Sequence, residues 1–274
     1  MKSFCTFFSS DLHLAIKVRI LVGYYFLSRN KSINILGIRI RYAPDTKNHS
    51  LLILKEIFIN RIYTFTEPVD VKLKAGKPST IIDVGANVGI AVAYFRQRYP
   101  DTRIIAIEAS PINYEYLSLN IKNNNIQNIK TINAFCSNVN ASTDFYHNFD
   151  KPGGSFGKGF KSQPKNSKQF LIDTKKLSQI ISDSKNIVIK IDVEGAEYLI
   201  LEDLSTSKNL SEVLEITAEV SVRSLRDYEK LLEIISVFSA LGFESRLICD
   251  YSVNFLKNKS KQDHLQLILL RQEL

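Results

Sequence analysis

From residue 80 onward, short apolar runs alternate with longer segments whose apolar residues recur at helical spacing. The short runs predict buried strands, and the longer amphipathic segments predict helices. The expected strands are residues 80–84, 103–107, 130–135, 187–193, 213–220, 243–248 and 265–270, and the expected helices are residues 90–98, 111–123, 196–204 and 225–241. This alternation predicts an α/β, Rossmann-like fold, in which a mostly parallel sheet carries helices on both faces and a hairpin closes the chain.

The first 79 residues follow a different pattern. We expect a helical lead-in over residues 1–30, a hairpin over residues 33–42 with its bend at Gly37, an amphipathic helix over residues 50–63 and a connector over residues 64–79. Pro68, Gly76 and Pro78 interrupt the connector, so we place a domain boundary there. The chain then divides into an N-terminal helical and hairpin extension, residues 1–79, and a main domain, residues 80–274.

One segment, residues 148–169, does not fit the alternation. It is rich in Gly, Ser, Lys and Pro, with aromatic residues spaced through it. A loop of this length inside a compact domain is usually functional or disordered. Because it follows the third expected strand, we interpret it either as a lid on the substrate side or as a mobile surface loop.

The composition suits a large globular core, and the chain carries a net positive charge. The chain has 274 residues, of which 45% are hydrophobic, and a formal net charge of +8. This charge suggests an anionic partner such as a membrane surface, a nucleic acid or an acidic substrate. However, the lysines and arginines form no dense stripe, so a lysine-rich composition is the simpler explanation and no nucleic-acid partner is expected.

The cysteines and the hydropathy bear on where the protein resides. Three cysteines lie far apart in the sequence: Cys5, Cys136 and Cys249. This spacing predicts neither a disulfide framework nor a zinc site and favours a reducing compartment, the cytoplasm. Residues 14–27 are the most apolar segment, but Lys17 and Arg19 interrupt it, so no membrane span is predicted. A helix covering the main domain is expected there, and peripheral docking at the inner membrane face is the alternative.

The clearest motif joins the first expected strand to the first expected helix, where residues 83–89 read Asp-Val-Gly-Ala-Asn-Val-Gly. Glycine permits positive φ and the close approach of a ligand. A dinucleotide fingerprint is G-x-G-x-x-G, whereas Gly85 and Gly89 have G-x-x-x-G spacing. With Asp83 before them, they resemble the glycine turn of class I S-adenosylmethionine-dependent methyltransferases. Glu108, which ends the second strand, can accept hydrogen bonds from both ribose hydroxyls of either cofactor.

A second constellation lies at the end of the fourth expected strand, where Lys190, Asp192 and Glu194 alternate with apolar residues. Alternate residues of a strand share a face, so these three charges can align. Charges at the end of an apolar strand are costly unless they are paired or used. They predict either a Lys–Asp pair that holds the strand end or carboxylates that contact the substrate or the cofactor rim.

Together the two motifs make a more specific resemblance. The sequence Lys-Ile-Asp-Val-Glu-Gly-Ala-Glu of residues 190–197, downstream of the glycine turn, resembles the FkbM family of methyltransferases. Residues 56–63 resemble the E-I-F…Y stretch of that family, residues 107–111 its F-E-P-x-P segment and residues 133–138 its N-A-A-L-S-D segment. Ala109 and Asn138 depart from these patterns. The resemblance covers residues 50–220.

The resemblance implies a seven-stranded methyltransferase sheet with one antiparallel strand from the C-terminal hairpin, and residues 80–274 as the S-adenosylmethionine-binding domain. The implied cofactor site has Asp83, Gly85, Ala86, Asn87 and Gly89 at the methionine and ribose end, Glu108 on the ribose hydroxyls, Ser110 at the adenine or ribose rim, and Asn133 and Ala134 beside adenine. Asp192 and Glu194 would face the methyl-transfer site. Many members of that family O-methylate sugars or polyketides, often in polysaccharide or natural-product pathways.

The sequence therefore predicts O-methylation of a sugar, glycan or natural product with S-adenosylmethionine. The candidate catalytic residues are Lys190, Asp192 and Glu194, with the two carboxylates as candidates for the general base or for hydrogen bonds to the substrate. His147 is an alternative base, although an exposed loop histidine is the preferred interpretation. No metal site is predicted. An RNA or protein methyltransferase, a NAD-type oxidoreductase and a non-catalytic binding module remain as alternatives, and the acceptor is expected to contact the N-terminal helices and residues 148–169.

Overall fold

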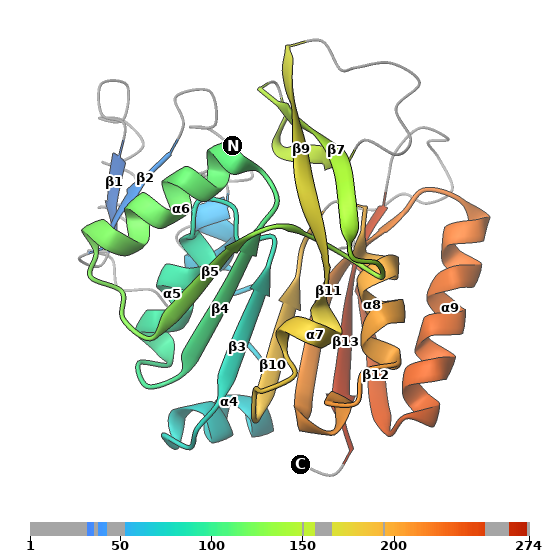
Figure 1. Ribbon diagram of the computed structural model, residues 1–274. Helices are drawn as coiled ribbons and strands as arrows, with labels where there is room; N and C mark the ends of the chain where they lie inside the picture. Colours follow the sequence, from blue (N-terminus) through green and yellow to red (C-terminus); the bar gives the residue numbers. More distant parts are fainter. Residues whose placement is uncertain are drawn as a thin grey trace, which may run out of the picture.

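A seven-stranded sheet forms the centre of the protein in the computed structural model (Figure 1). The described residues are 32–35, 38–42, 53–149, 151–156, 166–193, 195–249 and 263–272. In the order β12-β13-β11-β10-β3-β4-β5, the strands are β3 (Thr80–Val84), β4 (Arg103–Glu108), β5 (Ile129–Asn133), β10 (Ile187–Ile191), β11 (Val213–Val222), β12 (Phe243–Cys249) and β13 (Asp263–Arg271). Only β13 runs antiparallel to its neighbours in this sheet. The predicted α/β, Rossmann-like sheet with one antiparallel strand is confirmed.

Alternate residues of the central strands fill two separate cores, one on each face of the sheet. Ile82, Ile105 and Ile189 belong to the first core, whereas Ile81 and Ile104 belong to the second. The helices are α4 (Glu67–Lys74), α5 (Ile90–Arg98), α6 (Pro111–Asn123), α7 (Leu177–Ile180), α8 (Glu197–Ser205) and α9 (Leu225–Ala240), with a π-helix η2 (Lys55–Ile59) and a 3-10 turn η3 (Leu210–Glu212). Residues of α7, α8 and α9 enter the first core, and residues of α4, α5 and α6 enter the second. Helices therefore cover both faces.

Local sequence signals set the ends of several helices. Ser110 precedes α6, and its side chain accepts a hydrogen bond from the backbone N–H of Asn113 at 3.3 Å, while Pro111 occupies the first helical position. Gly242, at φ +82°, follows α9, as expected for a residue that ends a helix. Both helices lie where the sequence predicts them.

The third expected strand, residues 130–135, is divided between two sheets. β5 ends at Asn133, and the next residues enter a four-stranded sheet of order β6-β9-β7-β8. Its strands are β6 (Phe135–Ser137), β7 (Ala141–Asn148), β8 (Lys151–Phe156) and β9 (Ser167–Lys176). This second sheet stands above the carboxyl ends of the main sheet (Figure 1).

The expectation of a structureless loop over residues 148–169 is wrong in the part that the structure describes. β8 and the beginning of β9 lie inside this range, and residues 157–165 lie outside the described residues. Phe145 and Ile172 bury their side chains, while Leu171 is 75% exposed. A strand with one solvated face carries polar residues at every second position, so polar composition concealed these strands. A lid function for the segment stays a prediction.

The N-terminal hairpin is confirmed, because β1 (Ser32–Ile35) and β2 (Ile38–Arg41) pair antiparallel. The bend at Gly37 and the helical lead-in over residues 1–30 lie outside the described residues. The helix expected over residues 50–63 has its described helical part at residues 53–59, mostly as η2. The expectation that residues 64–79 are only a connector is wrong, since they contain α4.

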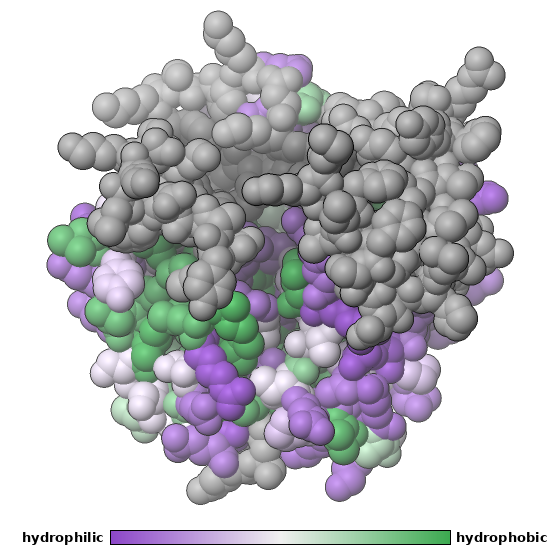
Figure 2. All heavy atoms as spheres, turned by 180° about the vertical axis from the view of Figure 1, so that it is seen from behind, coloured by the Kyte–Doolittle hydropathy of each residue, from purple (hydrophilic) through white to green (hydrophobic). Residues whose placement is uncertain are grey.

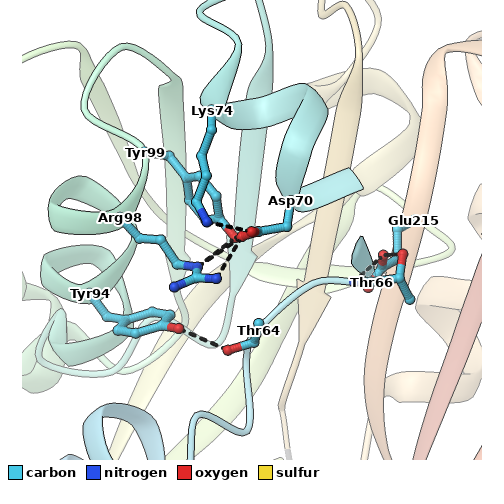
Figure 3. A network of polar contacts seen from close by, with 8 residues as sticks. All are labelled: Thr64, Thr66, Asp70, Lys74, Tyr94, Arg98, Tyr99 and Glu215. Carbon is cyan, nitrogen blue, oxygen red and sulfur yellow. Dashed lines mark hydrogen bonds and ion pairs between the residues drawn. The ribbon is translucent and has the colours of Figure 1, made fainter. Parts of the chain in front are cut away.

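The segment before β3 packs tightly on the sheet. Leu54, Phe65 and Val69 share the second core with α5. Figure 3 shows the polar contacts above this core: Asp70 accepts a hydrogen bond from the Tyr99 hydroxyl at 2.7 Å and pairs with Arg98 at 2.9 Å. The proposed division of the chain at residue 79 stays a prediction.

The surface is mixed in character. From behind, hydrophobic residues gather on the side that carries the C-terminal strands, and hydrophilic residues cover most of the other described surface (Figure 2). Within the described part of the chain, no helix combines the length and the apolar character that crossing a membrane requires.

Candidate functional site

A pocket opens at the carboxyl ends of β3, β4, β10 and β11, where ligands bind in open α/β sheets. Its apolar lining comes from the glycine turn, the start of α5, the second sheet and the segment before α4. Its polar lining residues are Glu56, Tyr63, Asn87, Glu108, Asn113, Lys190, Asp192 and Glu219. Among the predicted site residues, the pocket contacts Gly85, Ala86, Asn87, Glu108, Ala134, Lys190 and Asp192.

The glycine turn brings the backbones of β3 and β10 together. Gly85 has φ +81°, and a Cβ atom there would lie 1.8 Å from the backbone oxygen of Asp192. Gly89, at φ +89°, would place a Cβ atom 2.8 Å from a methyl carbon of Leu117 on α6. Asn87 also has positive φ, at +49°, which asparagine tolerates better than most residues. Close packing therefore requires glycine at positions 85 and 89, and the turn that they form lies at the pocket.

Glu108 lies at the end of β4 with its side chain buried beside the turn. Its carboxylate accepts hydrogen bonds from the backbone N–H groups of Asn87 and Ser110, each at 2.8 Å. Burial raises the pKa of Glu108 to about 7, although the two backbone hydrogen bonds oppose this shift. The carboxylate faces the pocket, so it can accept hydrogen bonds from ribose hydroxyls as predicted.

Ser110 and His147 form a buried pair next to this carboxylate. The Ser110 hydroxyl lies 2.8 Å from Nδ1 of His147, and both side chains are fully buried. The preferred interpretation of His147 as an exposed loop histidine is therefore wrong: it points inward from β7 and packs against Phe149. Neither Ser110 nor His147 is among the residues that line the pocket.

Asn133 and Ala134 hold the end of β4 from the other side. The Asn133 amide donates hydrogen bonds to the backbone oxygens of Glu108 and Ala109, at 2.8 and 3.1 Å. The Ala134 N–H donates to the Glu108 oxygen at 3.2 Å, and this residue lines the pocket. Asn133 therefore braces the end of β4, whereas Ala134 forms part of the pocket wall.

Lys190 joins the two central strands at their carboxyl ends. Its Nζ lies 2.9 Å from Oδ1 of Asp83, directly across the β3–β10 pair, and donates to the backbone oxygen of Gly85 at 2.9 Å. Both side chains of this ion pair are buried. Burial favours the neutral amine, but the carboxylates of Asp83 and Asp192 prevail and raise the pKa of Lys190 above its ordinary value. This is the geometry expected of a Lys–Asp pair that holds the strand end.

Asp192 follows β10 and reaches the pocket with 30% of its side chain exposed. Its Oδ2 accepts a hydrogen bond from the Tyr63 hydroxyl at 2.5 Å and lies 3.8 Å from Nζ of Lys190. Among the described residues, none donates a hydrogen bond to Oδ1. Of the two predicted carboxylates, Asp192 lines the pocket, and Glu194 lies outside the described residues.

Four polar residues of the pocket were missed by the sequence reasoning: Glu56, Tyr63, Asn113 and Glu219. Glu56 belongs to η2, and single π-helical turns recur at functional sites. Glu219 is, with Glu215, one of two charged residues in the strand β11, where buried apolar residues predominate, and such charges are a signal that could have found it. Tyr63 was noted only as part of the family-like stretch, and no local pattern predicts its contact with Asp192.

The electrostatics of the pocket suit a cation. Four carboxylates, Glu56, Glu108, Asp192 and Glu219, line it together with one ammonium group, Lys190, which is already paired with Asp83. S-adenosylmethionine carries a positive sulfonium, so these residues fit that cofactor. Groups of three or more His, Cys, Asp or Glu that could hold a metal ion are absent from the described residues.

The chain is similar in sequence to known methyltransferases. Residues 83–245 match the family model described as Methyltransferase FkbM domain. The chain is 26% identical over 180 residues to "Methyltransferase 1" of Beauveria bassiana (strain ARSEF 2860), which covers 59% of this chain and 70% of that protein. It is 24% identical over 196 residues to "Methyltransferase sdnD" of Sordaria araneosa, with 60% and 72% covered. A solved structure of a methyltransferase from Pyrococcus furiosus is 14% identical, with a TM-score of 0.42 and coverage of 93% and 97%.

Proposed function

The chain belongs to the FkbM methyltransferase family and uses S-adenosylmethionine, and from this premise we propose that it methylates a hydroxyl group of a sugar, glycan or natural product. Asn87 and Glu108, which line the pocket, would hold the ribose end of the cofactor, and Gly85 and Ala86 would lie at its methionine end. The bound cofactor supplies a methyl group that is already activated by its positive sulfur. The proposal includes a cytoplasmic location and a role in polysaccharide or natural-product biosynthesis.

The observation that carries the proposal is the carboxylate of Asp192 at the pocket surface. Transfer to a hydroxyl requires the acceptor oxygen to be held in line and its proton to be removed. Asp192 is partly exposed, and its Oδ1 is available within the described residues to accept that proton. Lys190 and Asp83 fix the strand from which Asp192 projects.

The charge of the pocket supports a neutral, hydroxyl-rich acceptor. Carboxylates accept hydrogen bonds from hydroxyl groups but repel phosphates. The lining therefore disfavours a nucleic acid, even though the net charge of the whole chain is +8. The alternatives of an RNA or protein methyltransferase are distinguished by the experiment below.

The test is to incubate the protein with S-adenosylmethionine labelled in the methyl group and with three acceptor fractions: neutral glycans and polyols, RNA, and protein. We expect label in the first fraction that survives mild alkali, because methyl ethers are stable where methyl esters are cleaved. The Asp192→Asn variant should lose transfer by roughly 10²- to 10⁴-fold, the usual contribution of a general base, while its affinity for the cofactor stays within about twofold, since Asp192 is assigned to the acceptor side. Label confined to RNA or protein would reject the proposal.

A further inference from the structure

We propose that Tyr63, contributed by the segment before α4, is a positioning residue that holds the carboxylate of Asp192 in its reactive orientation. The inference rests on the proposed function of Asp192 as the general base. It assigns to the N-terminal segment a part in the chemistry, in addition to any contact that this segment makes with the acceptor.

The contacts of Tyr63 fix one carboxylate oxygen and leave the other for the acceptor. The Tyr63 hydroxyl donates to Oδ2 of Asp192 at 2.5 Å, and Nζ of Lys190 approaches the same oxygen at 3.8 Å. The Lys190 ammonium also lies 5.0 Å from the centre of the Tyr63 ring, within the range of a cation–π contact. With Oδ2 approached from two sides, rotation of the carboxylate is restricted, and Oδ1 accepts no hydrogen bond from the described residues.

The Tyr63 hydroxyl remains a hydrogen-bond donor throughout the physiological range. Burial, together with the neighbouring charge of Asp192, raises the pKa of Tyr63 well above its ordinary value. The ring is only 7% exposed, so water competes little for the hydroxyl. A neutral phenol can therefore orient the carboxylate without taking the proton of the acceptor.

Residues on both sides of Tyr63 are held by distant parts of the chain. The backbone oxygen of Ile62 accepts a hydrogen bond from the Gln266 amide of β13 at 2.9 Å. The Thr64 hydroxyl lies 2.9 Å from the hydroxyl of Tyr94 on α5, as Figure 3 shows. Because the backbone is fixed before and after Tyr63, its hydroxyl is presented to Asp192 in a set direction.

The experiment compares Tyr63→Phe with Tyr99→Phe. Each variant removes one buried tyrosine hydroxyl that donates to a carboxylate, but Tyr99 bonds Asp70, does not contact Asp192 and does not line the pocket. For Tyr63→Phe we expect kcat to fall roughly 10- to 100-fold, as misplacement of a catalytic group does, with an unchanged dissociation constant for S-adenosylmethionine. For Tyr99→Phe, kcat should stay within about twofold of the wild-type value, because the Tyr63–Asp192 bond is intact.

A double-mutant cycle separates positioning from a structural role. In an Asp192→Asn background, Tyr63→Phe should lower kcat by less than about twofold, because the group that Tyr63 orients is already absent. A full additional loss in that background, a fall in cofactor affinity, or a wild-type kcat in Tyr63→Phe would overturn the inference. If the wild-type protein methylates only RNA or protein, the proposed acceptor class fails, and the same cycle on that acceptor still decides the role of Tyr63.

Discussion

The pocket has two walls that are held in place by different kinds of contact. The turn wall, residues 83–89 with Glu108, is held from within the parallel part of the sheet: Glu108 bonds the backbone of Asn87, 21 residues away, and that of Ser110, two residues away, and Lys190 of the neighbouring strand bonds the Gly85 oxygen, 105 residues away. The N-terminal wall, residues 53–63, contains no strand and is held by side chains that reach it from the end of β10 and from β13. Tyr63 meets Asp192 across 129 residues, and Ile62 meets Gln266 across 204.

This difference separates the two binding tasks of the enzyme. The turn wall needs β3, the two strands β4 and β10 that pair with it, and the start of α5, so it is built within the parallel part of the sheet. The N-terminal wall requires the whole sheet, including β13, before it acquires its shape. We therefore expect damage to the turn wall to reduce cofactor binding and stability together, and damage to the N-terminal wall to reduce acceptor turnover first.

The largest effect is expected for Gly85→Ala in the turn wall. A Cβ atom 1.8 Å from the backbone oxygen of Asp192 forces β3 and β10 apart, and the positive φ adds strain. We expect a loss of more than about 4 kcal/mol in the free energy of unfolding, in the range of severe core disruption, and no measurable cofactor binding. Urea denaturation and calorimetry check both.

Gly76 provides the matched control for this variant. It has a similar φ of +71°, but nothing lies within 4 Å of an added Cβ atom. Gly76→Ala should therefore show only the backbone cost, about 1 kcal/mol. Equal losses in the two variants would mean that the close approach at Gly85 is unimportant.

The next effect concerns Lys190, which contacts both walls through the Gly85 oxygen and the Tyr63 ring. Lys190→Met leaves the buried carboxylate of Asp83 without its counter-charge, which should cost about 3 kcal/mol or more. The double variant with Asp83→Asn removes the stranded charge and should regain much of this loss, as measured by urea denaturation. A double variant no more stable than Lys190→Met would show that the ion pair does not explain the cost.

A smaller effect is expected where the N-terminal wall is anchored. The Thr66 hydroxyl donates to the buried carboxylate of Glu215 at 2.6 Å (Figure 3), so Thr66→Val should lose about 1.5–3 kcal/mol of stability, the value of a hydrogen bond to a charged group. The acceptor KM should rise while cofactor affinity is unchanged. Thr64→Val breaks only a neutral pair with Tyr94 and should cost about 1 kcal/mol. A larger loss for Thr64→Val would contradict this ranking.

The same difference explains which features the sequence could predict. The bounds of β3, α5 and α6 were predicted correctly, because an apolar run, a glycine turn and a Ser-Pro start are local signals. The family-like motifs also identified the residues of the turn wall, and Asp192 does meet them at the pocket.

The remaining features depend on contacts that no local pattern encodes. The partnership of Tyr63 with Asp192 exists only once the full sheet has formed. His147 is buried because β7 pairs with β9 and lies against Ser110, whereas its sequence neighbours are polar. Predicting the burial of His147 would have required the strand order of the second sheet, which a Gly- and Lys-rich composition concealed.

The smallest expected effect tests whether the charge of Glu108, in the turn wall, determines how cofactor affinity varies with pH. Its carboxyl has a pKa raised to about 7 by burial, so about half of it is protonated at neutral pH in the free protein. A cationic cofactor with ribose hydroxyl donors favours the ionised form and lowers this pKa on binding. Binding therefore releases a proton below pH 8, and affinity must weaken as the pH falls: between pH 8 and pH 6 the dissociation constant should rise about tenfold.

Calorimetry in buffers with different ionisation enthalpies measures that released proton directly, and Glu108→Gln should make the affinity independent of pH. Glu197 is the matched control, because burial raises its pKa to about 7 as well, yet it does not line the pocket. Glu197→Gln should change how stability varies with pH and leave the tenfold effect on cofactor affinity intact. If Glu197→Gln abolished the pH dependence of cofactor affinity and Glu108→Gln preserved it, the titrating group would be Glu197 on α8 and not Glu108 at the end of β4.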